Sequence, residues 1–112
     1  MKLSGEATLL RVFVGETDKH AGRPLYEQIV LKARELNIAG ATVLRGVMGY
    51  GAHTRLHTEK VLRLSEDLPV VVEIVDAADK LAPLLGFLDE VVAEGLVTME
   101  KVHIVQYRSG QK

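Results

Sequence analysis

Residues 40–51 read GATVLRGVMGYG and form the most informative stretch of this 112-residue chain. The stretch begins with the β-branched and aliphatic residues of a strand and ends in two glycines around Tyr50. A glycine pair at a strand end allows positive φ or a close approach of the backbone to a ligand. The next segment carries His53, Arg55, His57 and Lys60. Because cationic side chains follow the glycines directly, the sequence predicts a binding site for an anion that starts here.

Similar runs of β-branched and aliphatic residues predict four strands, at residues 7–15, 41–48, 68–75 and 97–107. Apolar side chains at helical spacing follow Pro24, which can open a helix, and Asn37 is a plausible left-handed cap at its end. Residues 16–23, between the first strand and this helix, are polar and are predicted to form a loop.

A second helix is predicted after the third strand, with Asp76 as its cap and Gly95 at its end. Pro83 lies within this apolar pattern and cannot donate a backbone hydrogen bond. The sequence therefore predicts either a kink at Pro83 or a helix that starts near Leu81.

The predicted order β-α-β-β-α-β is typical of the ferredoxin-like α+β sandwich, in which two helices cover one face of a four-stranded antiparallel sheet. The length fits one domain over residues 1–112. The first and third strands carry apolar residues on both faces, for example Leu10 against Leu9 and Val72 against Val71. An apolar sheet face without a cover usually marks an interface, so we expect a homo-oligomer packed through its sheets.

Composition excludes several classes of protein. The net charge is −1, with 14 basic and 15 acidic residues, which argues against a nucleic-acid partner. The absence of cysteine excludes disulfides, thiol catalysis and cysteine-ligated zinc. No apolar run approaches the roughly 20 residues of a membrane-spanning helix, and we find no signal peptide. We therefore expect a cytoplasmic protein.

Five short motifs occur in a specific order on this pattern: GATV at 40–43, GYG at 49–51, LP at 68–69, EIV at 73–75 and KVHIV at 101–105. Together they resemble the PII (GlnB-like) signalling superfamily. The chain is most similar there to the PII-like domain-of-unknown-function family numbered 190, in which the run from the GYG motif through the EIV motif is close to a signature.

This resemblance implies a homotrimer with a nucleotide site in each cleft between subunits. It implies that Thr42 and Glu73 lie near the base, that Gly49 and Gly51 allow close backbone approach, and that Lys101 faces phosphate. It also implies a non-enzymatic regulator that needs no obligatory cofactor. Its partner would be a target protein or a membrane transporter.

The chain departs from the PII pattern where phosphate would bind. The segment before the last strand, residues 95–101, lacks the glycines that form a backbone phosphate nest, and Glu100 adds a negative charge. The paired arginines near the PII C-terminus reduce to Arg108. AMP or ADP therefore fits the reduced set of cations better than ATP, with Arg55 as a further contact.

The residues after the glycine pair keep several interpretations open. His53 and His57 are spaced i, i+4, which fits a metal site on a helix, a phosphate or partner contact, or plain solvent-facing side chains. Tyr50 and Lys60 are candidate partner contacts in the same loop. We expect residues 51–64 to be the most mobile internal segment without ligand, and to be ordered by ligand binding as a switch.

Two alternatives to the regulator remain. The first is a metal- or ion-handling protein like the CutA cation-tolerance family, with ligands from His53 and His57 and from His20 or His103. The second is an enzyme that acts in the cleft between subunits, although the sequence shows no nucleophile–base pair for one.

Overall fold

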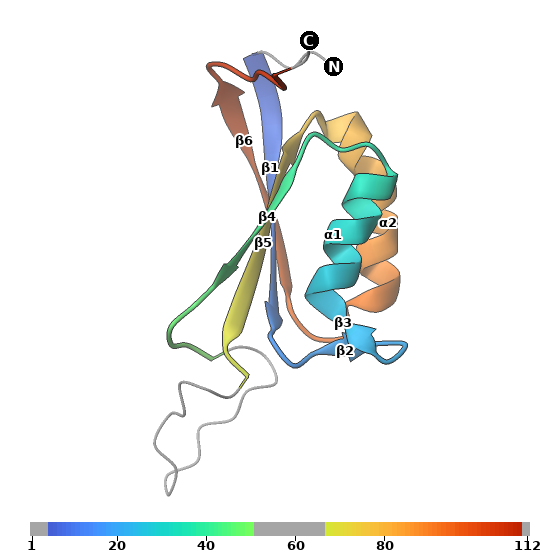
Figure 1. The fold of residues 1–112 in the computed structure, drawn as a ribbon. Coiled ribbons are helices and arrows are strands. Elements are labelled where there is room, and N and C mark those ends of the chain that lie inside the picture. The colour runs from blue at the N-terminus through green and yellow to red at the C-terminus, as the bar shows by residue number, and fades with distance from the viewer. Residues whose placement is uncertain (1–4, 51–66, 111–112) are drawn as a thin grey trace, which may run out of the picture.

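The computed structural model describes residues 5–50 and 67–110 of the chain. The elements are β1 (Gly5–Gly15), β2 (Lys19–His20), β3 (Arg23–Pro24), α1 (Leu25–Glu35), β4 (Ala41–Arg45), β5 (Pro69–Asp76), α2 (Ala78–Val91) and β6 (Leu96–Ile104). The main sheet has the order β4-β5-β1-β6, and each neighbouring pair is antiparallel. Both helices cover the same face of this sheet (Figure 1). The predicted ferredoxin-like α+β fold is confirmed.

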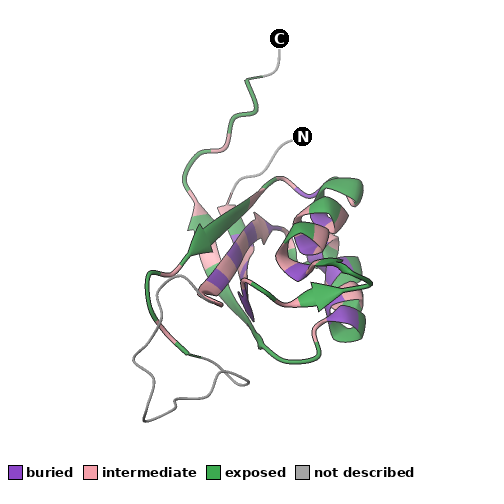
Figure 2. Ribbon diagram, turned by 60° about the horizontal axis from the view of Figure 1, so that its bottom comes forward, coloured by how far each residue is buried: buried purple, intermediate pink, exposed green. Residues whose placement is uncertain are grey.

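The hydrophobic core lies between the sheet and the helices. Alternate residues of β1 and β5, such as Val12 and Val72, are fully buried there. Ile29 of α1 and Leu81 and Leu84 of α2 close the core from the helix side. Figure 2 shows the resulting alternation of buried and half-buried residues along the central strands.

Neither of the two described helices lies over the opposite face of the sheet, which we call the open face (Figure 1). One row of cross-strand neighbours on this open face is apolar on all four strands: Leu44, Val71, Phe13 and Leu96. Leu44 and Leu96 at the two edges are 49% and 55% exposed. The prediction that the first and third strands are apolar on both faces is confirmed.

The predicted strand ends need correction at three places. The strand predicted over residues 41–48 ends at Arg45; the Gly46 N–H still donates to the carbonyl of Pro69 at 2.7 Å, and the chain leaves the sheet after it. The last strand ends at Ile104 rather than Tyr107. The predicted loop over residues 16–23 contains the small β2–β3 hairpin.

The predicted helix ends are also partly wrong. Asp76 is the last residue of β5, and α2 begins after Ala77 with no side-chain cap. Pro83 lies inside α2, so the predicted start near Leu81 is wrong, and α2 ends at Val91 before Gly95 is reached. Asn37 has φ of 60°, which confirms its left-handed conformation after α1. Neither described helix is long and apolar enough to cross a membrane.

Candidate functional site

The connection from α1 to β4 is held in place by a buried carboxylate. Asp76 is 1% exposed and accepts hydrogen bonds from the N–H of Ala39 at 2.9 Å and of Ala77 at 2.7 Å. One side chain therefore fixes both the start of β4 and the end of β5. This junction places the backbone of residues 39–42 between two pockets.

The first pocket lies on the open face of the sheet and has a volume of about 420 Å³. We call it the sheet-face pocket; it is lined by Leu9, Ala39, Gly40, Ala41, Thr42, Glu73, Val75, Ile104, Gln106 and Tyr107. Thr42 and Glu73 are cross-strand partners in this pocket, as are Leu9 and Val75. The pocket thus combines apolar walls with the hydroxyls of Thr42 and Tyr107, the amide of Gln106 and the carboxylate of Glu73.

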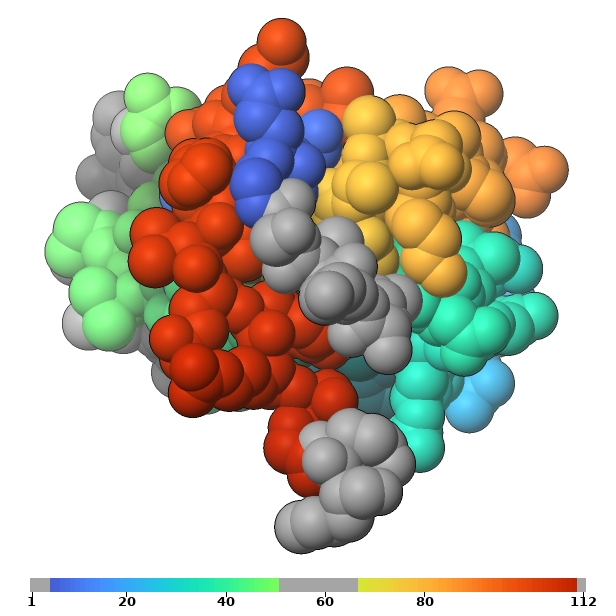
Figure 3. All heavy atoms as spheres, turned by 90° about the horizontal axis from the view of Figure 1, so that it is seen from above, coloured from blue at the N-terminus to red at the C-terminus, as the bar shows by residue number. Residues whose placement is uncertain are grey.

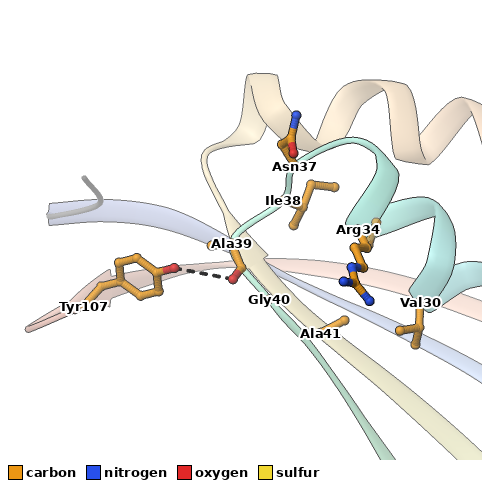
Figure 4. Close-up of a pocket in the computed structure, with 9 residues that line it drawn as sticks. Val30, Arg34, Asn37, Ile38, Ala39, Gly40, Ala41 and Tyr107 are labelled. Carbon is orange, nitrogen blue, oxygen red and sulfur yellow. Dashed lines mark hydrogen bonds between the residues drawn. The ribbon is translucent and has the colours of Figure 1, made fainter. Parts of the chain in front are cut away.

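The second pocket lies between α1 and the start of β4 and has a volume of about 540 Å³. We call it the helix-side pocket; it is lined by Val30, Ala33, Arg34, Asn37, Ile38, Ala39, Gly40, Ala41 and Tyr107. Most of its lining residues are labelled in Figure 4.

Tyr107 belongs to both pockets. It comes from the segment that follows β6, which runs across this end of the molecule from the start of β1 toward α1 (Figure 3). Its hydroxyl donates to the carbonyl of Ala39 at 3.4 Å (Figure 4). Tyr107 and the backbone of residues 39–41 therefore form the wall that the two pockets share.

Glu73 also takes part in an ion-pair network in the middle of the open face. Arg11 Nε lies 2.9 Å from Glu73 Oε2, and Arg11 Nη1 lies 3.0 Å from Glu100 Oε1. The hydrogen bond with Glu73 raises the pKa of Arg11 above its ordinary value, so the guanidinium stays charged. The network links β1, β5 and β6 across the apolar face.

The glycines after β4 approach a proline ring. A Cβ on Gly46 would lie 2.9 Å from Pro69 Cγ, and one on Gly49 would lie 3.1 Å from the same atom. Gly49 thus lies close to Pro69, the first residue of β5, whereas the close approach to a ligand stays a prediction.

Lys101 lies apart from the sheet-face pocket within one chain. Lys101 lies on the edge strand β6, where it pairs with Thr8 of β1. Thr42 lies on β4, at the opposite edge of the sheet. Neighbouring strands are about 4.8 Å apart, so three strand steps separate Lys101 and Thr42 by roughly 14 Å. Glu100 faces the open side, and Lys101 faces the other, because successive strand residues alternate. Arg108 is exposed after Tyr107 and lines neither pocket.

The remaining predicted loop contacts fall mostly outside the described residues. Gly51, His53, Arg55, His57 and Lys60 lie there, and so does the segment predicted to be mobile, 51–64. Tyr50 is described and is 69% exposed.

The histidines of the CutA-like alternative do not gather where the structure describes them. Over residues 5–50 and 67–110, no three His, Cys, Asp or Glu side chains are grouped to hold a metal ion. His20 on β2 and His103 near the end of β6 lie at opposite ends of the molecule (Figure 1).

Thr42 and Glu73, which the family resemblance predicted near a base, both line the sheet-face pocket, and the other side chains that line it were not predicted. Leu9 and Val75 had a signal, because each lies on the second apolar face of its strand. Tyr107 was predicted to be the end of a strand, and its only signal was an aromatic ring beside Arg108 in a polar tail.

Three comparisons with known proteins bear on this fold and site. The model of the DUF190 family, described as "Uncharacterized ACR", matches residues 7–104. A UPF0166 protein of Aquifex aeolicus is 37% identical over 87% of this chain and 91% of its own length. A UPF0166 protein of Methanocaldococcus jannaschii is 33% identical over 88% of this chain and 92% of its own.

The structural comparison agrees with these relatives. The structure of CPII bound to ADP and bicarbonate, from Thiomonas intermedia K12, superposes with a TM-score of 0.64 at 17% identity, over 90% of each chain. This chain therefore belongs to the DUF190 family and has a PII-like fold.

Proposed function

We propose that this chain is a non-enzymatic regulator that binds an adenine nucleotide, AMP or ADP more readily than ATP. The ligand lies in the sheet-face pocket, a neighbouring chain of a homotrimer completes the site, and binding is signalled through the loop after β4. The observation that carries the proposal is that Thr42 and Glu73, predicted to lie near the base, line one pocket together.

The chemistry of the pocket suits a planar base. Leu9 and Val75 offer an apolar surface, and the ring of Tyr107 adds an aromatic one. Glu73 uses Oε2 for Arg11, while its Oε1 makes no hydrogen bond within the described chain. This oxygen is an acceptor for an exocyclic amine or a ribose hydroxyl. Small-ligand sites commonly combine such apolar walls with a few polar groups.

The position of Lys101 supports a site made from two chains. Lys101 and the sheet-face pocket lie at opposite edges of one sheet, so phosphate contacts from Lys101 need the pocket of a neighbouring chain. The open apolar face provides the surface through which such chains would pack. That CPII was solved with ADP supports this class of ligand.

Isothermal titration calorimetry with AMP, ADP and ATP tests the proposal. The Lys101→Ala variant should bind AMP or ADP about ten- to a hundredfold more weakly, since a charge-assisted hydrogen bond contributes about 1.5–3 kcal/mol. Lys19→Ala, an exposed lysine on the β2–β3 hairpin, is the matched control and should bind like the wild type.

A second variant tests the pocket itself. Thr42 is exposed at the sheet edge, so Thr42→Trp should fold and should fill the sheet-face pocket, abolishing the heat of binding. Titrations of the wild type without heat up to millimolar nucleotide would overturn the nucleotide proposal.

A further inference from the structure

The helix-side pocket has the composition of a second ligand site. Its volume of about 540 Å³ lies within the range of small-molecule pockets. The walls are mainly aliphatic, from Val30 and Ala33 of α1 and from Ile38 and Ala41 on the segment that leads into β4. Arg34 is the cationic side chain among the lining residues.

Arg34 is an exposed residue, and no residue in the described part of the chain pairs with its side chain. Arg11 and Arg45 make ion pairs, and Lys32 pairs with Glu35 at 3.6 Å, but Arg34 makes no ion pair or side-chain hydrogen bond with any described residue. Figure 4 shows its side chain extended from α1 toward the start of β4.

Capping of α1 does not require Arg34 either. Backbone N–H groups already donate to the carbonyls at the end of α1: Leu36 to Lys32, Ile38 to Ala33, and Asn37 to Arg34. The carbonyl of Leu36 accepts from Lys80 Nζ at 3.3 Å. Since these carbonyls have partners, the end of α1 does not use the five N–H donors of the guanidinium, and no side chain over residues 5–50 and 67–110 uses them either.

We propose that the helix-side pocket binds a small organic monocarboxylate. The carboxylate accepts two parallel hydrogen bonds from the planar guanidinium of Arg34, and the apolar body of the ligand packs against Val30, Ala33 and Ile38. One cation among aliphatic walls suits a single negative charge, because a doubly charged phosphate would lose hydration without a second partner.

This site is separate from the proposed nucleotide site. The backbone of residues 39–41 and Tyr107 stand between the helix-side and sheet-face pockets, and Arg34 lines only the helix-side pocket. The proposal therefore does not rest on nucleotide binding, and the two can fail independently.

Titration of the ¹⁵N-labelled full chain with butyrate tests the proposal, with uncharged butyramide as the matched probe. Butyrate should shift the amide signals of Ala39, Gly40 and Ala41 and the Nε–H signal of Arg34, with saturation at millimolar concentration. Butyramide should leave these signals in place, because it cannot pair with the guanidinium as an anion.

Two variants make the experiment decisive. Arg34→Gln should weaken butyrate binding about tenfold to a hundredfold, as expected for the loss of a charge-assisted hydrogen-bonded pair. Arg23→Gln removes an exposed arginine of β3 and should bind butyrate like the wild type. The proposal is overturned if butyrate leaves residues 39–41 unshifted, or if Arg34→Gln binds butyrate as tightly as Arg23→Gln. A parallel AMP titration monitored at Thr42 reports on the nucleotide site alone.

Discussion

Gly95 allows two elements of the fold to pass close to one another. Gly95 was predicted to end the second helix, but it stands four residues beyond the end of α2, directly before β6. A Cβ at this position would lie 2.6 Å from the carbonyl oxygen of Phe13, and φ is +157°. The absence of a side chain therefore lets the α2–β6 connection pass against β1.

Replacing Gly95 by alanine should lower the free energy of unfolding by about 1–3 kcal/mol, because backbone or side chains must shift to admit the methyl group. Gly86→Ala is the matched control. Gly86 lies inside α2, and its Cβ would meet open space, so alanine there should stabilise the protein by about 1 kcal/mol. Urea unfolding of both variants measures the difference, and equal stabilities would contradict the role given to Gly95.

At the residue scale, contacts between residues that are far apart in the sequence could not be predicted from the sequence alone. The residue type at Gly49 predicted a close approach to a ligand, whereas the neighbour that the structure shows is Pro69, which is 20 positions further along the chain. That Thr42 and Glu73 lie near a base was predicted through a family resemblance. Tyr107 was missed, because its hydrogen bond reaches Ala39, which is far away in sequence.

At the scale of elements, the strands and helices were predictable from the sequence, and their ends were not. Runs of β-branched and aliphatic residues identified β1 and β5, and helical spacing of apolar residues identified the helices. The ends depend on which backbone groups find partners in the folded chain, and the last hydrogen bond from the end of β4 to β5 joins Gly46 and Pro69. Asp76 shows the same effect, because it has the residue type of a helix cap and instead bridges two connections.

Asp76→Ala should therefore destabilise the fold more than the loss of a helix cap would. The change leaves the half-buried N–H groups of Ala39 and Ala77 without their acceptor, at a cost of up to about 1–3 kcal/mol for each donor. Asp79→Ala, at an exposed position in the first turn of α2, should cost less than 1 kcal/mol. Thermal unfolding of the two variants compares them, and a smaller loss for Asp76→Ala would refute the bridging role.

For the whole molecule, the open sheet face connects assembly with the proposed nucleotide site. The apolar row from Leu44 to Leu96 crosses this face, and beside it Glu73 belongs both to the sheet-face pocket and to the network around Arg11. A neighbouring chain packed on the face would cover the apolar row and bring further residues near the pocket. Assembly and nucleotide binding should therefore depend on each other.

A charge placed in the apolar row tests this arrangement. Leu44→Lys should disrupt the proposed homotrimer, because an unpaired charge buried in an interface costs about 3 kcal/mol or more. Leu31→Lys is the matched control, since Leu31 lies on α1 and is 50% exposed, against 49% for Leu44. Sedimentation equilibrium should give three times the 12.3 kDa chain mass for the wild type and for Leu31→Lys, and a mass approaching one chain for Leu44→Lys. A wild-type mass of one chain would refute the trimer. An intact Leu44→Lys trimer would show that the chains assemble through a different surface.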